Sequence, residues 1–189
     1  MRKIVNSTYL SLDGVVDNVG DWPSMNPGGD EERRFRIQLD LLQAADVLLM
    51  GRRTYEGFAP VWSARCGDPF SDRINAMDKY VVSSTLTEPA WSNTRVIAGD
   101  PVPAIRALKE QDGGHIVQYG FGRLSFALLE AGLLDELVLW MHPFFVGRGG
   151  PEALLYRETR ATLFELTEAT ALPPNLAVLS YRHVGAAAG

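Results

Sequence analysis

The chain has 189 residues, of which 46% are hydrophobic and 22% are charged, and its formal net charge is −5. This hydrophobicity excludes disorder as the main character of the chain, and the negative charge gives no overall field for a nucleic-acid backbone. The single cysteine, Cys66, excludes an intramolecular disulfide, and no segment approaches the roughly 20 apolar residues that span a bilayer. Because the first residues lack the apolar region of a signal peptide, we expect a cytoplasmic protein that binds neither nucleic acid nor membrane.

Strand and helix patterns alternate along the chain. The elements predicted in chain order are a strand at 3–12, a helix at 31–45 capped by Asp30, a strand at 47–50, a helix of about two turns that ends before Pro60, strands at 80–82 and 95–97, a helix at 101–110, a strand at 115–119, a helix at 124–131, a strand at 137–140, and two strands at 162–170 and 176–181.

This order predicts an α/β fold. Apolar strands without alternation, separated by helices, are typical of a mostly parallel sheet that helices cover on both faces. The last two strands are expected to form an antiparallel edge. We therefore predict a three-layer, doubly wound single domain over residues 1–184, with a frayed tail at 185–189. In such sheets ligands bind beyond the carboxyl ends of the strands.

Basic and hydroxyl residues follow the first buried strand. Gly51, Arg52, Arg53 and Thr54 open the next helix, where backbone N–H groups, two guanidinium groups and a hydroxyl would suit an anion. The alternative is a pair of solvated arginines. However, cations near a helix N-terminus oppose the helix dipole, so local stability does not explain them.

Two further strand ends carry residues that suit phosphates. Ser83 and Ser84 follow the strand at 80–82, although hydroxyl residues are common at strand ends. Residues 120–123, Gly-Phe-Gly-Arg, follow the strand at 115–119 and open a helix. This segment differs from the dinucleotide fingerprint because Ser125 replaces its third glycine. The three strand ends together predict a phosphate-binding edge more strongly than any one of them.

Other candidate sites are weaker. His115, His142 and His183 lie on separate predicted strands without clustered carboxylates, so we expect no metal site. Asn6-Ser7-Thr8 has the spelling of a glycosylation sequence, but it lies in a predicted core strand.

Several segments resemble one family in order along the chain. They are Ser11-Leu12-Asp13-Gly14, Met50-Gly51-Arg52-Arg53-Thr54-Tyr55-Glu56 with Trp62 downstream, Val82-Ser83-Ser84-Thr85-Leu86, Gly120-Phe121-Gly122-Arg123-Leu124, Gly132-Leu133-Leu134-Asp135-Glu136-Leu137, and Pro143 with Gly147-Arg148-Gly149-Gly150. The sequence resembles the dihydrofolate-reductase-fold superfamily, in the branch related to the reductase (C-terminal) domain of the riboflavin-biosynthesis bifunctional deaminase-reductase. No H-x-E or P-C-x-x-C motif of a deaminase is present.

The resemblance implies that NADPH is the cofactor and that a hydride is transferred to a pyrimidine or pteridine-type ring. It places the 2′-phosphate at Arg52, Arg53 and Ser84, and the pyrophosphate at Thr54 and at residues 120–123, which also border the nicotinamide. The expected cofactor-binding residues are Gly51, Arg52, Arg53, Thr54, Ser83, Ser84, Gly120, Phe121, Gly122, Arg123 and Leu124. In dihydrofolate reductases the pair that matches Gly120-Phe121 is two glycines joined by a cis peptide, and Phe121 departs from that pattern.

The substrate side is less specific. Asp13, at the end of the first strand, is the expected catalytic acid, and the alternative is an Asp that only forms the turn with Gly14. Asp30, Glu31 and Glu32 fall where dihydrofolate reductases carry a carboxylate, but Asp30 is already the predicted helix cap. The aromatic side chains expected to wall a substrate pocket, although each is often simply part of a core, are Tyr9, Trp22, Phe58 and Trp62.

Two other functions remain open, namely a non-catalytic NADPH-binding or regulatory protein and a generic nucleotide-binding module. Relatives in this branch commonly form homodimers. Residues 137–140 with Phe144 and Phe145 would provide an apolar interface, unless they are buried within one subunit.

Overall fold

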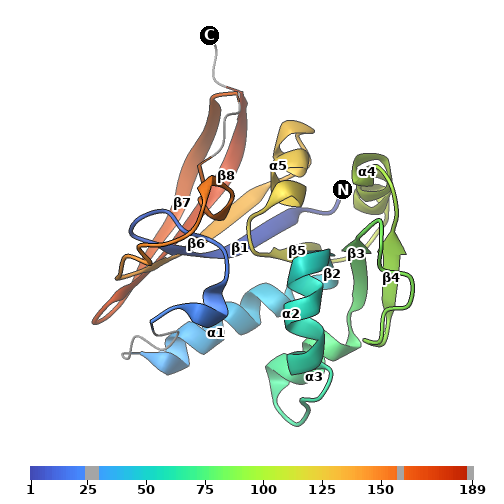
Figure 1. The fold of residues 1–189 in the computed structure, drawn as a ribbon, viewed down its shortest axis with the longest axis horizontal. Coiled ribbons are helices and arrows are strands. Elements are labelled where there is room, and N and C mark those ends of the chain that lie inside the picture. The colour runs from blue at the N-terminus through green and yellow to red at the C-terminus, as the bar shows by residue number, and fades with distance from the viewer. Residues whose placement is uncertain (24–29, 157–159, 187–189) are drawn as a thin grey trace. The chain divides into compact units, whose positions relative to one another are not determined.

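The computed structural model describes residues 1–23, 30–156 and 160–186. The chain divides into two compact units. The first unit is Met1–Val5 with Phe35–Tyr119, and the second is Asn6–Arg34 with Gly120–Gly189. The strands have the hydrogen-bonded order β4-β3-β2-β5-β1-β6-β8-β7 in one eight-stranded sheet (Figure 1). The pairs β2–β3, β2–β5 and β3–β4 are parallel, whereas β6–β8 and β7–β8 are antiparallel. The predicted parallel sheet with an antiparallel C-terminal edge is therefore confirmed, while the single domain stays a prediction.

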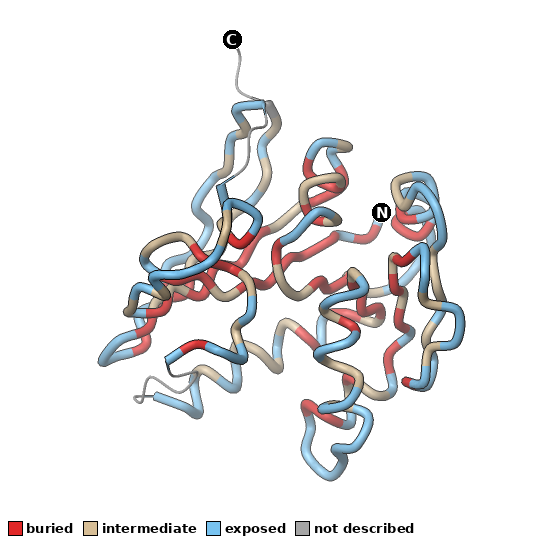
Figure 2. The backbone as a smooth tube through the Cα atoms, viewed as in Figure 1, coloured by how far each residue is buried: buried red, intermediate tan, exposed pale blue. Residues whose placement is uncertain are grey.

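The first unit is a parallel α/β unit. It contains most of α1 (Glu31–Gln43), then β2 (Ala45–Gly51), α2 (Arg52–Trp62), α3 (Pro69–Ala76), β3 (Asp78–Val82), β4 (Thr94–Ile97), α4 (Pro101–Glu110) and β5 (His115–Tyr119). Asp30 caps α1 as predicted, because its Oδ1 accepts the backbone N–H of Arg33 at 2.9 Å. The buried core gathers Leu48, Met50 and Val81 from the strands with Tyr55 and Ile74 from α2 and α3 (Figure 2).

Two helices differ from the prediction. Helix α2 continues through Pro60 to Trp62 instead of ending before the proline. Pro60 is exposed, so the carbonyl that lacks its N–H partner can bond to water, and Trp62 packs against Phe70 with ring centroids 4.9 Å apart. Helix α3 was not predicted, although Asp68 caps it by accepting the N–H groups of Phe70 and Ser71. Tertiary packing outweighs the local proline signal here.

The second unit carries the antiparallel edge. It contains most of β1 (Ile4–Ser11), the short helix η1 (Val19–Asp21), α5 (Arg123–Glu130), β6 (Glu136–His142), the short helix η2 (Pro151–Ala153), β7 (Thr162–Leu172) and β8 (Leu176–Ala186). Strands β7 and β8 run side by side as a long hairpin in which Ala186 pairs with Thr162 (Figure 1). Gly185 and Ala186, expected in a frayed tail, are thus part of the ladder, and residues 187–189 lie outside the described part of the chain.

A buried histidine ends β6. The side chain of His142 is 1% exposed and lies among aromatic rings of the second unit. Its ring centroid is 4.8 Å from that of Tyr9, 5.4 Å from that of Trp22 and 5.7 Å from that of Phe144. Burial, and secondarily the charge of Arg34, lowers the pKa of His142 to about 4. The imidazole is therefore neutral at physiological pH.

Because His142 is buried in its neutral form, we predict that the folded protein loses stability at acid pH. The unfolded imidazole has a pKa near 6.5 and binds a proton before the folded one does. Stability is thus complete above the unfolded pKa and falls as the pH drops toward 4, by up to roughly 3 kcal/mol for this group. His142→Phe should remove this part of the acid loss, whereas His183→Phe, a change of the half-buried histidine on β8, should keep it. Urea denaturation at a series of pH values measures both, and parallel wild-type and His142→Phe profiles would contradict the expectation.

Candidate functional site

The carboxyl ends of β2 and β3 lie side by side in the first unit. The parallel register pairs Gly51 with Val82, so the start of α2 adjoins the turn that follows β3. Arg52 links the two segments, because its guanidinium donates to the hydroxyl of Thr85 and also to Glu56 Oε1, the latter at 2.6 Å. The structure thus brings together two of the three predicted phosphate elements.

The start of α2 is open to a ligand. Gly51 is the N-cap residue, and its helix has no side-chain cap. A Cβ atom built on Gly51 would meet nothing within 4 Å, so a bulky group can approach the backbone there. Arg52 and Arg53 are exposed, and the Thr54 hydroxyl donates to the carbonyl of Tyr119 at 3.5 Å. Uncapped N–H groups beside exposed guanidinium groups can bind a phosphate.

The two serines after β3 have different environments. Ser83 is buried, and its Oγ accepts the N–H groups of Thr85 at 3.2 Å and of Leu86 at 3.0 Å. Ser84 is exposed. Ser83 therefore shapes the turn, and Ser84 is the serine whose hydroxyl can reach a ligand.

The glycine segment after β5 is held by β1 and α5 within the second unit. Gly120 has φ 74°, a conformation that glycine adopts at little cost. Its carbonyl accepts from Asn6 Nδ2 at 2.8 Å and from Ser125 Oγ at 3.3 Å, and Ser125 Oγ also accepts the N–H of Gly122 at 3.4 Å. Sequence reasoning missed Asn6 and Ser125 as supports of this segment. The run of polar residues Asn6-Ser7-Thr8 inside a predicted core strand was the signal that could have found Asn6, because buried polar groups need hydrogen-bond partners.

The other residues of this segment divide by exposure. Phe121 is 6% exposed, and its ring packs edge-on against Phe126 with centroids 4.8 Å apart. Gly122 and Arg123 are exposed, and Leu124 is half-buried. The Gly120–Phe121 peptide is not among the cis bonds of the described backbone. Gly122, at the start of α5, is therefore the accessible part of the expected pyrophosphate contact.

Asp13 holds a loop. Its carboxylate accepts the hydroxyl of Ser11 and the backbone N–H groups of Val146 at 3.1 Å and Gly147 at 2.9 Å. These hydrogen bonds, that of Ser11 first, lower the pKa of Asp13 below its ordinary value. The carboxylate is ionised at neutral pH, so it can accept a hydrogen bond from a ligand but is a poor proton donor. This geometry agrees with the turn-forming alternative and leaves the catalytic role a prediction.

The four predicted pocket aromatics form two groups. In the second unit, Tyr9 and Trp22 both pack edge-on against His142. In the first unit, Phe58 and Trp62 pack on each other with centroids 6.4 Å apart, and Phe58 also contacts Tyr119. His142, which the sequence suggested only as an isolated histidine, is the polar centre of the first group.

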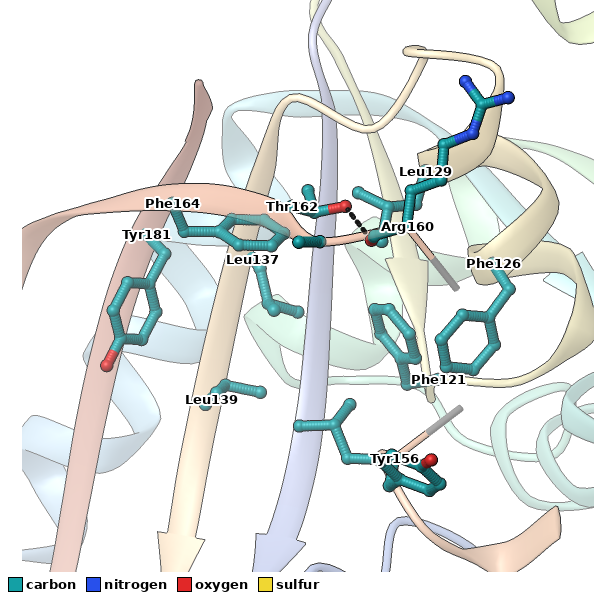
Figure 3. Close-up of a pocket in the computed structure, with 12 residues that line it drawn as sticks. Phe121, Phe126, Leu129, Leu137, Leu139, Tyr156, Arg160, Thr162, Phe164 and Tyr181 are labelled. Atoms are coloured by element: carbon teal, nitrogen blue, oxygen red, sulfur yellow. Dashed lines mark hydrogen bonds between the residues drawn. The ribbon is translucent and has the colours of Figure 1, made fainter. Parts of the chain in front are cut away.

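A separate apolar cavity of about 480 Å³ lies in the second unit between α5 and strands β6, β7 and β8 (Figure 3). Phe121, Phe126 and Phe164 turn toward it, with Tyr156 at one end and Arg160 near the other. The side chain of Phe121 therefore faces this apolar cavity. Only the backbone of Phe121 is left to contact a bound cofactor.

Among the described residues, no group of three or more His, Cys, Asp or Glu side chains is placed to hold a metal ion. None of the described helices combines the length and apolarity needed to cross a bilayer.

Known proteins resemble this chain over nearly its whole length. The uncharacterized protein YyaP of Bacillus subtilis is 27% identical over 159 residues, which are 79% of each chain. A pyrimidine reductase-like protein of Corynebacterium diphtheriae has a similar fold, with a TM-score of 0.70, 14% identity, and coverage of 97% of this chain and 92% of that one. A deaminase/5-amino-6-(5-phosphoribosylamino)uracil reductase of Thermotoga maritima superposes with a TM-score of 0.65 and 13% identity, covering 96% of this chain and 56% of that one.

The solved structures share the fold at low identity, and the family assignment comes from the sequence. The model of the RibD C-terminal domain matches residues 2–178. The chain therefore belongs to the RibD C-terminal domain family.

Proposed function

We propose that the protein is an NADPH-dependent reductase that transfers a hydride to a pyrimidine or pteridine-type heterocycle. One observation carries the proposal: the aligned ends of β2 and β3 place two exposed arginines and the exposed Ser84 around the uncapped start of α2. A doubly charged 2′-phosphate would be neutralised there by Arg53 and by Arg52, whose guanidinium also bonds to Glu56 and Thr85. The family membership and the relatives named as reductases support the same reading.

The residues present fit the cofactor. Arg52, Arg53 and Ser84 would hold the 2′-phosphate, and the open backbone at Gly51 admits it because no atom lies within 4 Å of the Cβ position. Gly122 offers a second close approach for the pyrophosphate, since its Cβ position is equally open. When bound, NADPH supplies a hydride for an electrophilic carbon of the ring.

The chain's own residues have to orient the ring and accommodate its charge. Reduction of a ring C=N or carbonyl carbon leaves an electron pair on the neighbouring heteroatom, which must take up a proton. The ionised Asp13 accepts hydrogen bonds from Ser11, Val146 and Gly147, and the carboxylate is only half-buried, so its exposed part would accept a ring N–H. Asp13 would thus orient the ring, and water is the proton source that this environment favours.

A non-catalytic NADPH-binding protein is the second candidate. The observation that favours it is the low pKa of Asp13, which leaves the expected acid without a proton to give. Both candidate functions predict that the protein binds NADPH. Only the reductase predicts that NADPH is oxidised when a substrate is added. A cytoplasmic location remains a prediction from the sequence.

We also propose a homodimer, on a surface different from the one first expected. Residues 137–140 are buried within the second unit, and only Phe145 of the expected interface is largely exposed. Exposed apolar side chains are found instead on the β7–β8 hairpin, at Leu163, Leu166 and Val184, and in the lining of the cavity, at Tyr156. Contiguous exposed apolar surface is typical of a protein contact, and we propose that these side chains contribute to one.

The first prediction concerns cofactor choice. Arg52→Ala/Arg53→Ala should weaken NADPH binding until it equals NADH binding, because each desolvated charge-assisted contact contributes roughly 1.5–3 kcal/mol. Arg106→Ala, which removes one positive charge from an exposed position on α4, should bind both cofactors like the wild type. Calorimetric titration measures the affinities. Equal wild-type affinities for NADPH and NADH would refute the cofactor assignment.

The second prediction separates the two roles of Asp13. If Asp13 orients the ring, Asp13→Asn should lower turnover by roughly 10²-fold while NADPH affinity stays within about twofold. Ser11→Ala weakens the same loop contact but keeps the carboxylate, so it should lower turnover by less than about fivefold. The assay is NADPH oxidation with a panel of aminopyrimidines and dihydropterins. Equal losses in the two variants would mean that Asp13 acts only through the loop, and a panel without any substrate would favour the binding protein.

The third prediction concerns assembly. Light scattering should give the mass of a dimer for the wild type and of a monomer for Leu163→Lys/Leu166→Lys, because two lysines would be desolvated at the contact. Val61→Lys, at an exposed apolar position on α2 outside the hairpin, should leave the dimer mass unchanged. A wild-type monomer at micromolar concentration would overturn the homodimer.

A further inference from the structure

His142 is a buried polar group whose hydrogen bonds are not made. Both ring nitrogens lack a hydrogen-bond partner among the described residues, although the side chain is only 1% exposed. Buried polar atoms in folded proteins are nearly always paired, and an unpaired one costs about 1–3 kcal/mol. A bound ligand is one source of the partner that the described residues do not supply.

The described aromatic neighbours contact His142 through their rings and do not hydrogen-bond its nitrogens. The rings of Tyr9 and Trp22 meet the imidazole at interplanar angles of 63° and 79°, so they contact it edge to face. The one polar atom of Trp22, Nε1, donates to the carbonyl of Asp17 at 3.0 Å. Phe144 has no polar side-chain atom. The aromatic enclosure gives the histidine packing without hydrogen bonds.

His142 also lies at the ligand-binding edge of its unit. It is the last residue of β6, and ligands of such sheets bind beyond the carboxyl ends of the strands. The backbone carbonyl of Phe144, two residues later, accepts the N–H of Leu12 at 2.9 Å, which joins this segment to the residue before Asp13. The candidate ring-binding carboxylate and the unpaired imidazole thus belong to adjoining segments of the same unit.

Two of the rings that contact the imidazole reach the surface. Tyr9 and Phe144 are half-buried, so they contact both His142 and the exterior. A ligand would have to displace one of these rings to reach the imidazole. A neutral imidazole provides one N–H donor and one acceptor, which suit the carbonyl and N–H groups of an uncharged heterocycle better than they suit a phosphate.

We propose that His142 is a substrate-contacting residue, and that a ring nitrogen of this histidine hydrogen-bonds the heterocycle of the bound substrate. This inference rests on the proposed reductase function and adds to it the residue that recognises the ring. It also explains why a histidine occupies a position where an apolar side chain would fill the same space without unpaired nitrogens.

The test uses 5,6-diaminouracil as a ring without ribose or phosphate. His142→Phe keeps the aromatic volume and removes both nitrogens, so affinity for 5,6-diaminouracil should fall by about fivefold to tenfold in calorimetry. His183→Phe is the matched control, because it is the same substitution on β8, and it should bind like the wild type. His142→Asn, which keeps one donor and one acceptor, should recover part of the affinity. Equal affinities of the wild type and His142→Phe would overturn the proposal.

A second measurement uses the wild-type protein alone, so that the proposal can be tested even if His142→Phe does not fold. In nitrogen-15 spectra of wild-type protein labelled at histidine, the ring signals of His142 should shift on addition of 5,6-diaminouracil while those of His183 stay in place. Unchanged His142 signals, or no binding of the pyrimidine to the wild type, would overturn the inference. NADPH titration of the same samples reports on the reductase function separately, because failure to bind NADPH would refute that function and leave the pyrimidine result readable.

Discussion

The buried polar side chains of β1 place the strongest constraint on the candidate site. Asn6, Ser7 and Thr8 are each no more than 5% exposed in the middle of a sheet strand. A buried amide or hydroxyl must find hydrogen bonds within the fold. The amide nitrogen of Asn6 donates to the carbonyl of Gly120, and the hydroxyl of Ser7 accepts from Trp140 Nε1. The backbone carbonyl of Ser7 accepts the N–H of Gly120, whereas Thr8 Oγ1 has no hydrogen-bond partner among the described residues. The bonds from Asn6 and Ser7 hold the backbone just before the exposed glycine of the α5 start.

A similar principle holds within the first unit. Gly51 and Val82 are paired in the parallel register, so the segments after β2 and β3 emerge together. Ser83 uses its hydroxyl on the backbone of its own turn, and Arg52 joins this turn to α2. Polar residues that look equivalent in the sequence therefore divide into those that shape the backbone and those that remain accessible, such as Ser84 and Arg53.

The second unit combines an ionised carboxylate with a neutral imidazole. Hydrogen bonds from Ser11, Gly147 and Val146 lower the pKa of Asp13, whereas burial lowers the pKa of His142 to about 4. Both pKa values are lowered, but the two groups then differ in charge. Asp13 is a charged hydrogen-bond acceptor, and His142 is an uncharged group that can donate one hydrogen bond and accept another. Neither holds a ready proton at neutral pH. A reaction on this unit would therefore depend on orientation of the ring and on proton delivery from water.

The sequence by itself determined the order of the strands and the parallel sheet, because apolar periodicity, helix caps and glycines act over short ranges. The phosphate site that it predicts at residues 51–54 stays a prediction. The sequence also carried the motifs that led to the family. The length of α2 beyond Pro60 was decided by tertiary packing, since the contact of Trp62 with Phe70 joins residues of two helices. The roles of Asn6, Ser125 and His142 were likewise decided by the fold. Each depends on which polar groups lie within hydrogen-bond distance after strands far apart in the chain pair, and no local pattern encodes that distance.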